Sequence, residues 1–301
     1  MDRLKEIAKN LDSKDKLSKF REKFILPEDK IYLDGNSLGV LAKDIIDEIN
    51  HTIKEEWGNN LISSWNKSWI KLPRMISQKL ASIIKSKKDE VYVGSSTSIN
   101  LFKLIKSILQ SNKSIKNIST DNLNFPSDKY ICELIAKDFK IDFNFLKYGS
   151  DLIADIEKLK EFIIKKRGII VLSHVAYKSS YRYPIKEISK FCRDNNTVVI
   201  WDLSHSIGAV NIDMGLNQVD YAIGCTYKYL NGGPGSPAFI YVREQELRKL
   251  KSPLRGWFSH EKPFEYSNEY NESNSIEKFS NGTPHILSLS TLKTSLDITI
   301  E

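Results

Sequence analysis

The feature that most constrains the fold is an alternation of short apolar runs with amphipathic segments between residues 89 and 242. The stretch "DEVYVGSSTSINLFKLIKSIL" (89–109) is typical of a strand, a small-residue turn and a helix. Further apolar runs of strand length lie at 116–119, 141–147, 168–173, 197–202, 221–227 and 237–242, and helical spacing occurs at 127–138, 151–166 and 184–195. Strands that alternate with helices predict an α/β fold with a mainly parallel sheet.

The parts of the chain that flank this region carry weaker patterns. Residues 4–24 have helical spacing that is interrupted around "DSKD", and 30–41 is an extended stretch with a turn signal at its Asp-Gly-Asn. Further helices are predicted at 41–57, at 73–85 and from 286 onward. From about 244 to 285 the chain is polar and aromatic without clear periodicity, so no regular element is predicted there.

Composition argues against several classes of protein. The chain has 301 residues, of which 41% are hydrophobic and 28% charged, as in soluble globular proteins. Its net charge of +7 comes from 45 basic and 38 acidic residues mixed along the chain, and no basic stripe with interleaved aromatics appears. A solvated surface is therefore favoured over nucleic-acid binding, although an anionic substrate or cofactor fits the charge. We see no secretory signal and no apolar run near the roughly 20 residues of a membrane helix, so we expect no membrane partner.

Cysteine usage indicates the compartment. Cys132, Cys192 and Cys225 stand far apart in the sequence and form no CxxC pair. This spacing supports neither a disulfide framework nor a cysteine-based zinc site, and we expect no metal centre. Free thiols fit a reducing environment, so we expect a cytoplasmic protein.

Ligands of an open α/β sheet bind at the carboxyl ends of its strands, so the residues after each predicted strand are the candidates for a site. Ser95, Ser96, Thr97 and Ser98 follow the first strand and lead into a helix. Free N–H groups and the helix dipole favour an anion at such a position. The alternative is a plain serine cap, and taken alone the motif favours that alternative.

Two charged residues follow other apolar strands. Asp202 comes after "VVIW", where burying an acid is costly unless it meets a cation or a proton donor. Lys228 comes after "YAIGCTY" and before the turn "NGGPG". Burial makes a lysine amine nucleophilic, which Schiff-base chemistry requires. The alternatives are an aspartate that caps a loop and a lysine whose stem reaches solvent.

The helix start at 95–98, Asp202 and Lys228 are each weak signals, but together they indicate a specific kind of site. The interval between Asp202 and Lys228 is long enough for a crossover between neighbouring strands. Pyridoxal 5′-phosphate needs a lysine for its aldehyde, a carboxylate that keeps its ring nitrogen protonated, and an anion site for its phosphate. The sequence therefore predicts a pyridoxal-phosphate site. A nicotinamide-binding Rossmann fold is disfavoured, since no GxGxxG follows a strand.

The chain resembles the fold-type-I pyridoxal-phosphate enzymes, and among them the kynureninases. The motifs that carry the resemblance are "YLDGNSLG" (32–39), "WGNNLISSWN" (57–66), "TSINLFKL" (97–104), "NFPSDKY" (124–130), "WDLSHSIGAV" (201–210), "YKYLNGGPGSPAFIYV" (227–242), "LRGWFSH" (254–260) and "FSNGTPHILSLS" (279–290). They follow the family's order across nearly the whole chain. The resemblance implies a central, mainly parallel seven-stranded sheet flanked by helices.

The resemblance also implies roles for individual residues. Lys228 would bind the cofactor covalently, Asp202 would pair with its ring nitrogen, and Tyr227 would take part in catalysis. The other implied cofactor contacts are Thr97, Ser98, Phe125, Asp128, Ser173, His205, Trp257 and Thr283, and the implied substrate residues are Ser37, Trp65 and Gly282. The residues that match Trp257 and Thr283 belong to the second subunit in the family, so a homodimer with a shared site is implied.

The implied activity is hydrolysis of L-kynurenine, and of 3-hydroxy-L-kynurenine as well, to an anthranilate and L-alanine. The expected organisation is a helical and extended segment at 1–50, a large cofactor-binding domain at 51–285, and at 286–301 the start of a helix into a small C-terminal domain that is largely missing. Two alternatives remain open: another enzyme of the class, such as an aminotransferase or a cysteine desulfurase, and a protein that binds the cofactor without turnover. A desulfurase would need a mobile cysteine in its later region, and none follows Cys225.

Overall fold

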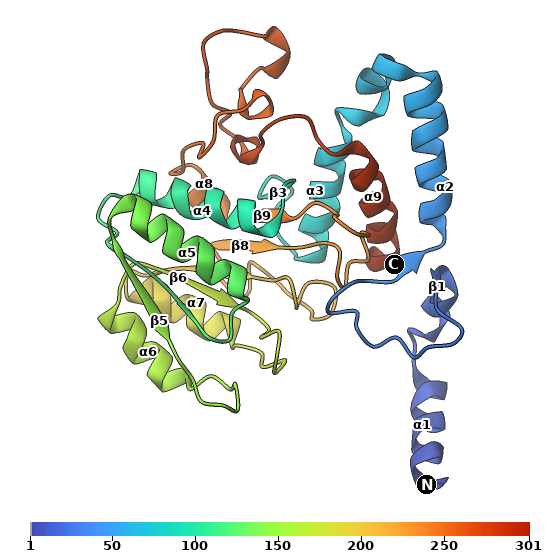
Figure 1. The fold of residues 1–301 in the computed structure, drawn as a ribbon, viewed down its shortest axis with the longest axis horizontal. Helices are drawn as coiled ribbons and strands as arrows, with labels where there is room; N and C mark the ends of the chain where they lie inside the picture. Colours follow the sequence, from blue (N-terminus) through green and yellow to red (C-terminus); the bar gives the residue numbers. More distant parts are fainter. Residues whose placement is uncertain (1) are drawn as a thin grey trace.

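The computed structural model describes residues 2–301 (Figure 1). The strands are β1 (Phe24–Ile25), β2 (Leu41–Ala42), β3 (Val91–Val93), β4 (Asn117–Asp121), β5 (Asp142–Leu146), β6 (Ile169–Ser173), β7 (Val198–Asp202), β8 (Tyr221–Gly224) and β9 (Phe239–Val242). The helices are α1 (Asp2–Lys14), α2 (Asp44–His51), α3 (Leu72–Ile83), α4 (Thr97–Ser111), α5 (Pro126–Phe139), α6 (Ile156–Lys165), α7 (Ile185–Asp194), α8 (Glu244–Leu247) and α9 (Ile286–Ile300).

A seven-stranded sheet in the order β3-β9-β8-β7-β6-β4-β5 forms the centre of the molecule, which confirms the predicted α/β fold. The strands from β5 to β8 in this order pair in parallel. β9 is antiparallel to both of its neighbours, β8 and β3, so β9 alone is reversed in this sheet. The carboxyl ends of the other six strands therefore meet at one edge, where a ligand is expected.

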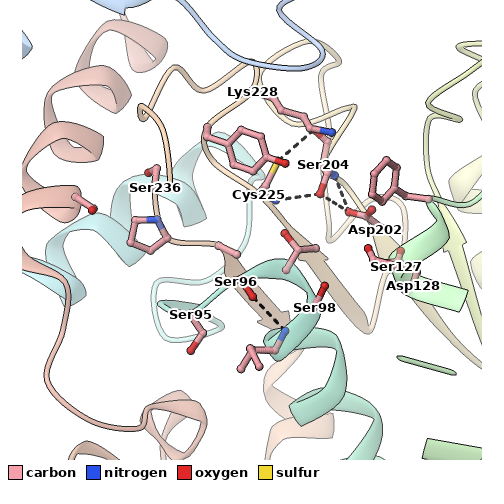
Figure 2. Close-up of a pocket in the computed structure, with 18 of the residues that line it drawn as sticks. Ser95, Ser96, Ser98, Ser127, Asp128, Asp202, Ser204, Cys225, Lys228 and Ser236 are labelled. Carbon is pink, nitrogen blue, oxygen red and sulfur yellow. Dashed lines mark hydrogen bonds between the residues drawn. The ribbon is translucent and has the colours of Figure 1, made fainter. Parts of the chain in front are cut away.

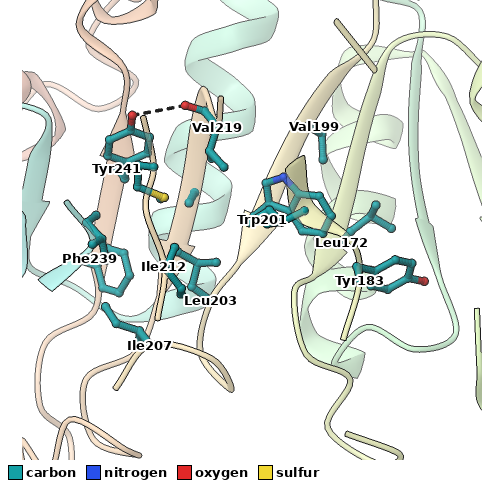
Figure 3. Close-up of a cluster of buried hydrophobic side chains, with 14 of the residues drawn as sticks. Leu172, Tyr183, Val199, Trp201, Leu203, Ile207, Ile212, Val219, Phe239 and Tyr241 are labelled. Carbon is teal, nitrogen blue, oxygen red and sulfur yellow. Dashed lines mark hydrogen bonds between the residues drawn. The ribbon is translucent and has the colours of Figure 1, made fainter. Parts of the chain in front are cut away.

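Apolar side chains cover both faces of the sheet. On one face, α4 and α5 pack through residues such as Leu104 and Ile135. On the other face, α3, α6, α7 and α9 share a core with Trp201 of β7 and Phe239 of β9 (Figure 3). Burial on both faces explains why the strands are continuous apolar runs in the sequence, without polar alternation.

The predicted elements are confirmed in place, with differences at their ends. The helix predicted over 151–166 begins only at Ile156, and the helix predicted over 41–57 begins at Asp44 and changes to a π-helical turn at Thr52. The strand predicted over 221–227 ends at Gly224. It ends early because the Cys225 backbone N–H donates to the Ser204 hydroxyl (3.1 Å) instead of to a neighbouring strand.

Two parts of the chain stand away from this core (Figure 1). α1 contributes no buried residue, and its Leu4 and Leu11 are exposed. The segment from Leu254 to Glu272 has only short 3-10 turns and an aromatic cluster around Trp257, Phe258 and Phe264. None of the helices in residues 2–301 is long and apolar enough to cross a lipid bilayer.

Candidate active site

A cavity of about 750 Å³ opens at the carboxyl edge of the sheet. It is lined by Ser95, Ser96, Thr97, Ser98, Ile99, Phe125, Ser127, Asp128, Asp202, Ser204, His205, Cys225, Tyr227, Lys228, Gly235, Ser236, Pro237, Ala238, His285 and Ser288. Most of these residues come from the loops after β3, β4, β7 and β8. Figure 2 shows Lys228 and the carboxyl groups toward the top and right of this cavity, with the serines that precede and begin α4 below them.

Lys228 lies in the turn after β8, where it is only 8% exposed. Its Nζ is 2.5 Å from Nε2 of His205 and 5.7 Å from the ring centroid of Phe125. The turn is held from outside, because the Gly39 N–H donates to the Tyr227 carbonyl (2.8 Å). A β-carbon on Gly39 would lie 2.2 Å from the Lys228 carbonyl oxygen, so the "YLDGNSLG" stretch packs directly on this turn.

Two buried carboxyl groups lie in the cavity. Oδ1 of Asp202 accepts hydrogen bonds from the Ser204 backbone N–H (2.8 Å) and the Ser204 hydroxyl (2.6 Å). Asp128, in the first turn of α5, has an Oδ2 that is buried without a hydrogen-bond partner. Burial raises the pKa of both carboxyl groups, and the charge of Asp202 raises the pKa of Asp128 further. A positive charge or a proton donor in the cavity would therefore offset the cost of burying the two carboxyl groups.

Histidine 205 is neutral at physiological pH. Burial, together with the nearby charge of Lys228, lowers the pKa of His205 to about 4. A neutral imidazole accepts one hydrogen bond, so His205 Nε2 can accept from the Lys228 ammonium at 2.5 Å. The contact orients the amine inside the cavity.

The start of α4, where the sequence predicts an anion site, lines the cavity. Ser96 caps the helix, and its hydroxyl accepts from the Ile99 N–H (3.4 Å). Thr97 and Ser98 occupy the first helical turn and line the cavity. Ser95 adopts a left-handed conformation (φ 58°) that turns the chain from β3 into the helix. The free N–H groups and the hydroxyls of this turn suit a phosphate.

The loop after β4 presents the aromatic ring of Phe125. Asp121, the last residue of β4, accepts from the Leu123 N–H (2.9 Å) and the Asn124 N–H (3.0 Å), and also from the Tyr183 hydroxyl (2.6 Å). Burial raises the pKa of Asp121 to about 6. These contacts fix the loop so that Phe125, which is 42% exposed, faces the cavity beside Lys228.

The structure brings most of the predicted site residues together and leaves six outside the cavity. Lys228, Asp202, Tyr227, Thr97, Ser98, Phe125, Asp128 and His205 all line it. The six outside are Ser173, Ser37, Trp65, Trp257, Gly282 and Thr283, and their roles remain predictions. The hydroxyl of Ser173 is buried and donates to Oδ1 of Asn124, so it does not point into the cavity.

The other five lie in separate places on the surface. Ser37 is exposed and donates to Asp34 (2.7 Å). Trp65 lines a neighbouring hollow of about 580 Å³ with other apolar side chains. Gly282 and Thr283 line a second cavity, and Trp257 lines a third one within the aromatic segment.

Several residues of the cavity were not identified from the sequence. Ser127 stands inside the motif "NFPSDKY" and Ser236 follows "NGGPG", so the matching stretches already contained them. His285 and Ser288 stand inside the motif "FSNGTPHILSLS", but neither residue was assigned a role from the sequence. They reach the cavity only because α9 packs against α3 and returns to the sheet edge.

The donor set of the cavity fits the predicted cofactor. The unpartnered Oδ2 of Asp128 and the buried Asp202 need a proton donor, which a protonated ring nitrogen supplies. Lys228 offers an amine within the same cavity, and the start of α4 offers N–H and hydroxyl donors for a phosphate. An amine, a carboxylate and an anion site on one cavity are the three groups that pyridoxal 5′-phosphate requires.

Comparison with known proteins decides the family. Residues 31–301 match the family "Aminotransferase class-V". A kynureninase from Pseudomonas fluorescens is 40% identical over 293 residues, which are 96% of this chain and 69% of that protein. The chain belongs to the kynureninase family. Another kynureninase, from Deinococcus radiodurans, is 37% identical over 302 residues, which are 96% of this chain and 70% of the relative.

Solved structures extend the fold comparison beyond the kynureninases. A cysteine desulfurase from Thermococcus onnurineus NA1 superimposes with a TM-score of 0.81 at 18% identity, over 94% of this chain and 70% of that one. A cystine C–S lyase in complex with cysteine persulfide reaches 0.78 at 19% identity, over 91% and 72%. At these identities the likeness concerns the fold alone. Kynureninase family membership rests on the sequence relatives.

Proposed function

We propose that this protein binds pyridoxal 5′-phosphate and hydrolyses L-kynurenine to anthranilate and L-alanine. The observation that carries the proposal is the meeting of Lys228 with two buried carboxyl groups, in a chain 40% identical to a kynureninase. Lys228 would hold the cofactor's aldehyde, Asp202 its ring nitrogen, and the start of α4 its phosphate. Phe125, whose ring lies beside the amine of Lys228, would contact the cofactor ring.

The cofactor, when bound, supplies an electron sink for charge that develops on a substrate carbon. The chain's own residues would hold and move protons, and the cavity has to admit the one water that the hydrolysis consumes. Lys228 Nζ would be the base for the substrate's α-proton, and neutral His205 would hold that amine in place. Burial raises the pKa of Tyr227 to about 12, so its hydroxyl stays protonated at neutral pH and can donate a hydrogen bond.

The direct test mixes purified protein with pyridoxal 5′-phosphate and L-kynurenine and follows anthranilate fluorescence. We expect product from wild type and none from Lys228→Ala. Borohydride reduction before digestion should mark Lys228 and no other lysine. A parallel assay with 3-hydroxy-L-kynurenine measures the substrate preference. Cofactor uptake without product would contradict the proposal and favour a binding protein without turnover.

A desulfurase activity is the alternative that the fold comparison raises. Cys132, Cys192 and Cys225 are each at most 2% exposed, and burial raises the pKa of all three thiols. Buried, protonated thiols are poor nucleophiles, which disfavours persulfide chemistry within this part of the chain. Sulfide release from L-cysteine, measured in the same preparations, should stay at background. The unpaired thiols also support a cytoplasmic location.

We further propose that two chains form a homodimer with shared sites. Trp57 is 56% exposed and Ile62 is 78% exposed beside Trp65, which leaves a large apolar surface open to water. The family resemblance implies that Trp257 and Thr283 act at a cofactor, yet both lie outside the cavity of their own chain. Contribution to the partner's cavity would reconcile the two observations.

A further inference from the structure

A buried ammonium group lies behind the anion site. Lys103, on α4, is only 1% exposed. Its Nζ donates to the hydroxyl of Ser95 (3.0 Å) and to the carbonyl of Phe279 (2.8 Å), and lies 5.1 Å from the ring centroid of Tyr92. Within residues 2–301, no carboxylate lies within ion-pair distance of Lys103.

An ammonium in this setting is costly. Taking a charge out of water is strongly unfavourable unless a counter-charge or a full set of hydrogen bonds compensates it. Burial lowers the pKa of Lys103 to about 8, so the amine is still mostly protonated at neutral pH. Its two acceptors in the protein are neutral oxygens. A bound anion nearby would supply the missing negative charge.

The geometry places such an anion on the other side of Ser95. Ser95 lines the cavity next to Thr97 and Ser98. Lys103 lies about 9 Å along α4 from Thr97, at 1.5 Å per residue, and helical side chains of this kind point back toward the N-terminus. Because the Ser95 oxygen accepts from Lys103, the ammonium fixes the orientation of this side chain at the start of α4.

We propose that Lys103 is a positioning residue for phosphate at the start of α4. It acts through Ser95, whose hydroxyl it orients, and its positive charge adds to that of the helix N-terminus. The inference deepens the proposed function, because the phosphate in question is that of pyridoxal 5′-phosphate. It assigns a role to a lysine that touches neither the amine nor the carboxyl groups of the cavity.

The test compares Lys103→Met with Lys106→Met. Lys106 lies on the same helix, half-buried, with its Nζ 5.7 Å from the ring centroid of Phe102, so it controls for loss of a lysine from α4. Calorimetry with inorganic phosphate, and titration with pyridoxal 5′-phosphate and with pyridoxal, give three affinities for each variant. Losing a hydrogen bond to a charged group corresponds to about a 10-fold to 100-fold loss of affinity.

We expect Lys103→Met to weaken both phosphate and pyridoxal 5′-phosphate by that factor and to leave pyridoxal nearly unchanged. Lys106→Met should alter none of the three. An equal loss for pyridoxal and its phosphate would mean a merely structural role, and unchanged phosphate affinity would overturn the proposal outright.

Two additions keep the outcome decisive. If Lys103→Met fails to fold, Ser95→Ala takes its place, since it removes the relay and keeps the ammonium. A loss confined to the phosphorylated ligands supports the relay, and no selective loss overturns it. Wild type that binds inorganic phosphate but forms no borohydride-trapped adduct at Lys228 would defeat the proposed function while leaving the role of Lys103 standing.

Discussion

At the residue scale, substitutions of Asp202 can distinguish its chemical role at the cofactor from its structural role as an acceptor for Ser204. Its pKa is raised by burial, so its charged form is unfavourable in the folded chain until a cation or proton donor arrives. Asp202→Asn keeps an oxygen that can accept from both donors of Ser204. We expect turnover to fall at least about 100-fold, because an amide cannot keep the cofactor's ring protonated. Thermal stability of the free protein should not fall.

The control for this variant is Asp202→Ala, which removes the acceptor for Ser204 as well. We expect it to lose both activity and stability, measured by turnover and by urea denaturation. Should Asp202→Asn keep near-normal turnover, the pairing of Asp202 with the ring nitrogen would be wrong.

The raised pKa of Asp121 predicts how the stability of the protein depends on pH. Its pKa is raised from 3.8 to about 6 by burial, so the folded chain binds a proton that the unfolded chain has already released between these values. Stability from this group is therefore greatest below pH 4 and is lost as pH rises through 6, by about 3 kcal/mol for a shift of roughly two units. Asp121→Asn lacks this loss.

The measurement is urea denaturation of both proteins between pH 4 and pH 7.5. From pH 4 to pH 7.5, the free energy of unfolding of Asp121→Asn should rise by about 3 kcal/mol relative to that of wild type. The contributions of the other titrating groups cancel in this difference. A difference that stays flat with pH would show that Asp121 is ionised at all these values. The expected gain also separates this carboxyl from Asp202, whose replacement is read out through turnover.

At the scale of elements, the N-terminal segment packs backbone against backbone on the Lys228 turn. A β-carbon on Gly39 would meet the Lys228 carbonyl oxygen at 2.2 Å and the Asn231 Cα at 2.8 Å. We expect Gly39→Ala to displace the turn, to destabilise the protein by about 1–3 kcal/mol and to lower cofactor uptake, although no chemical group of the cavity is removed.

Gly35→Ala is the matched control for the same segment. Its β-carbon would meet only the Tyr229 ring, at an ordinary contact distance of 3.6 Å. Stability and cofactor absorbance should stay close to wild type. Equal behaviour of the two variants would mean that the segment does not position Lys228.

The elements also show which parts of the fold the sequence could predict. Strands such as β7 are buried on both faces, so their local composition already determines them. The π-helical turns at Thr52–Asn59 and Trp65–Trp69 have no local signal, because their hydrogen bonds and contacts depend on neighbouring segments. The reversed direction of β9 could not be predicted from hydrophobic periodicity either, because parallel and antiparallel strands of a buried sheet have the same sequence pattern.

The same reasoning applies to the site. Asp202 and Lys228 were predictable because a charge after an apolar strand is conspicuous in the sequence. Lys103 was not, because it stands in an amphipathic helix among other lysines, and only the packing of Ser95 and Phe279 around it shows that it is buried. His285 differs from Lys103, because it stands inside the quoted motif "FSNGTPHILSLS", although only the fold shows that it lines the cavity. The division of the chain into three regions remains a prediction, although α9 packs closely on α3.

At the scale of the whole molecule, the proposed homodimer predicts that two inactive variants can regain activity when they are combined in one dimer. Suppose that each cavity is completed by Trp257 of the other subunit. In a hybrid dimer of one Lys228→Ala chain and one Trp257→Ala chain, both substitutions then fall in the same site. The other site is then intact. Hybrids purified through two different tags should recover about half of the wild-type activity and bind cofactor tightly at one site, because a twofold dimer has two equivalent sites.

A hybrid of Lys228→Ala with Asp202→Asn is the matched control. Both residues line the cavity of their own chain, so each site of that hybrid keeps one defect and no recovery is expected. If the control hybrid regained activity, Lys228 or Asp202 would also have to act in the cavity of the other subunit. If the Trp257 hybrid has only the mean activity of its parents, Trp257 acts within its own subunit or not at all. Its exposed ring, 39% open to solvent, then needs another explanation.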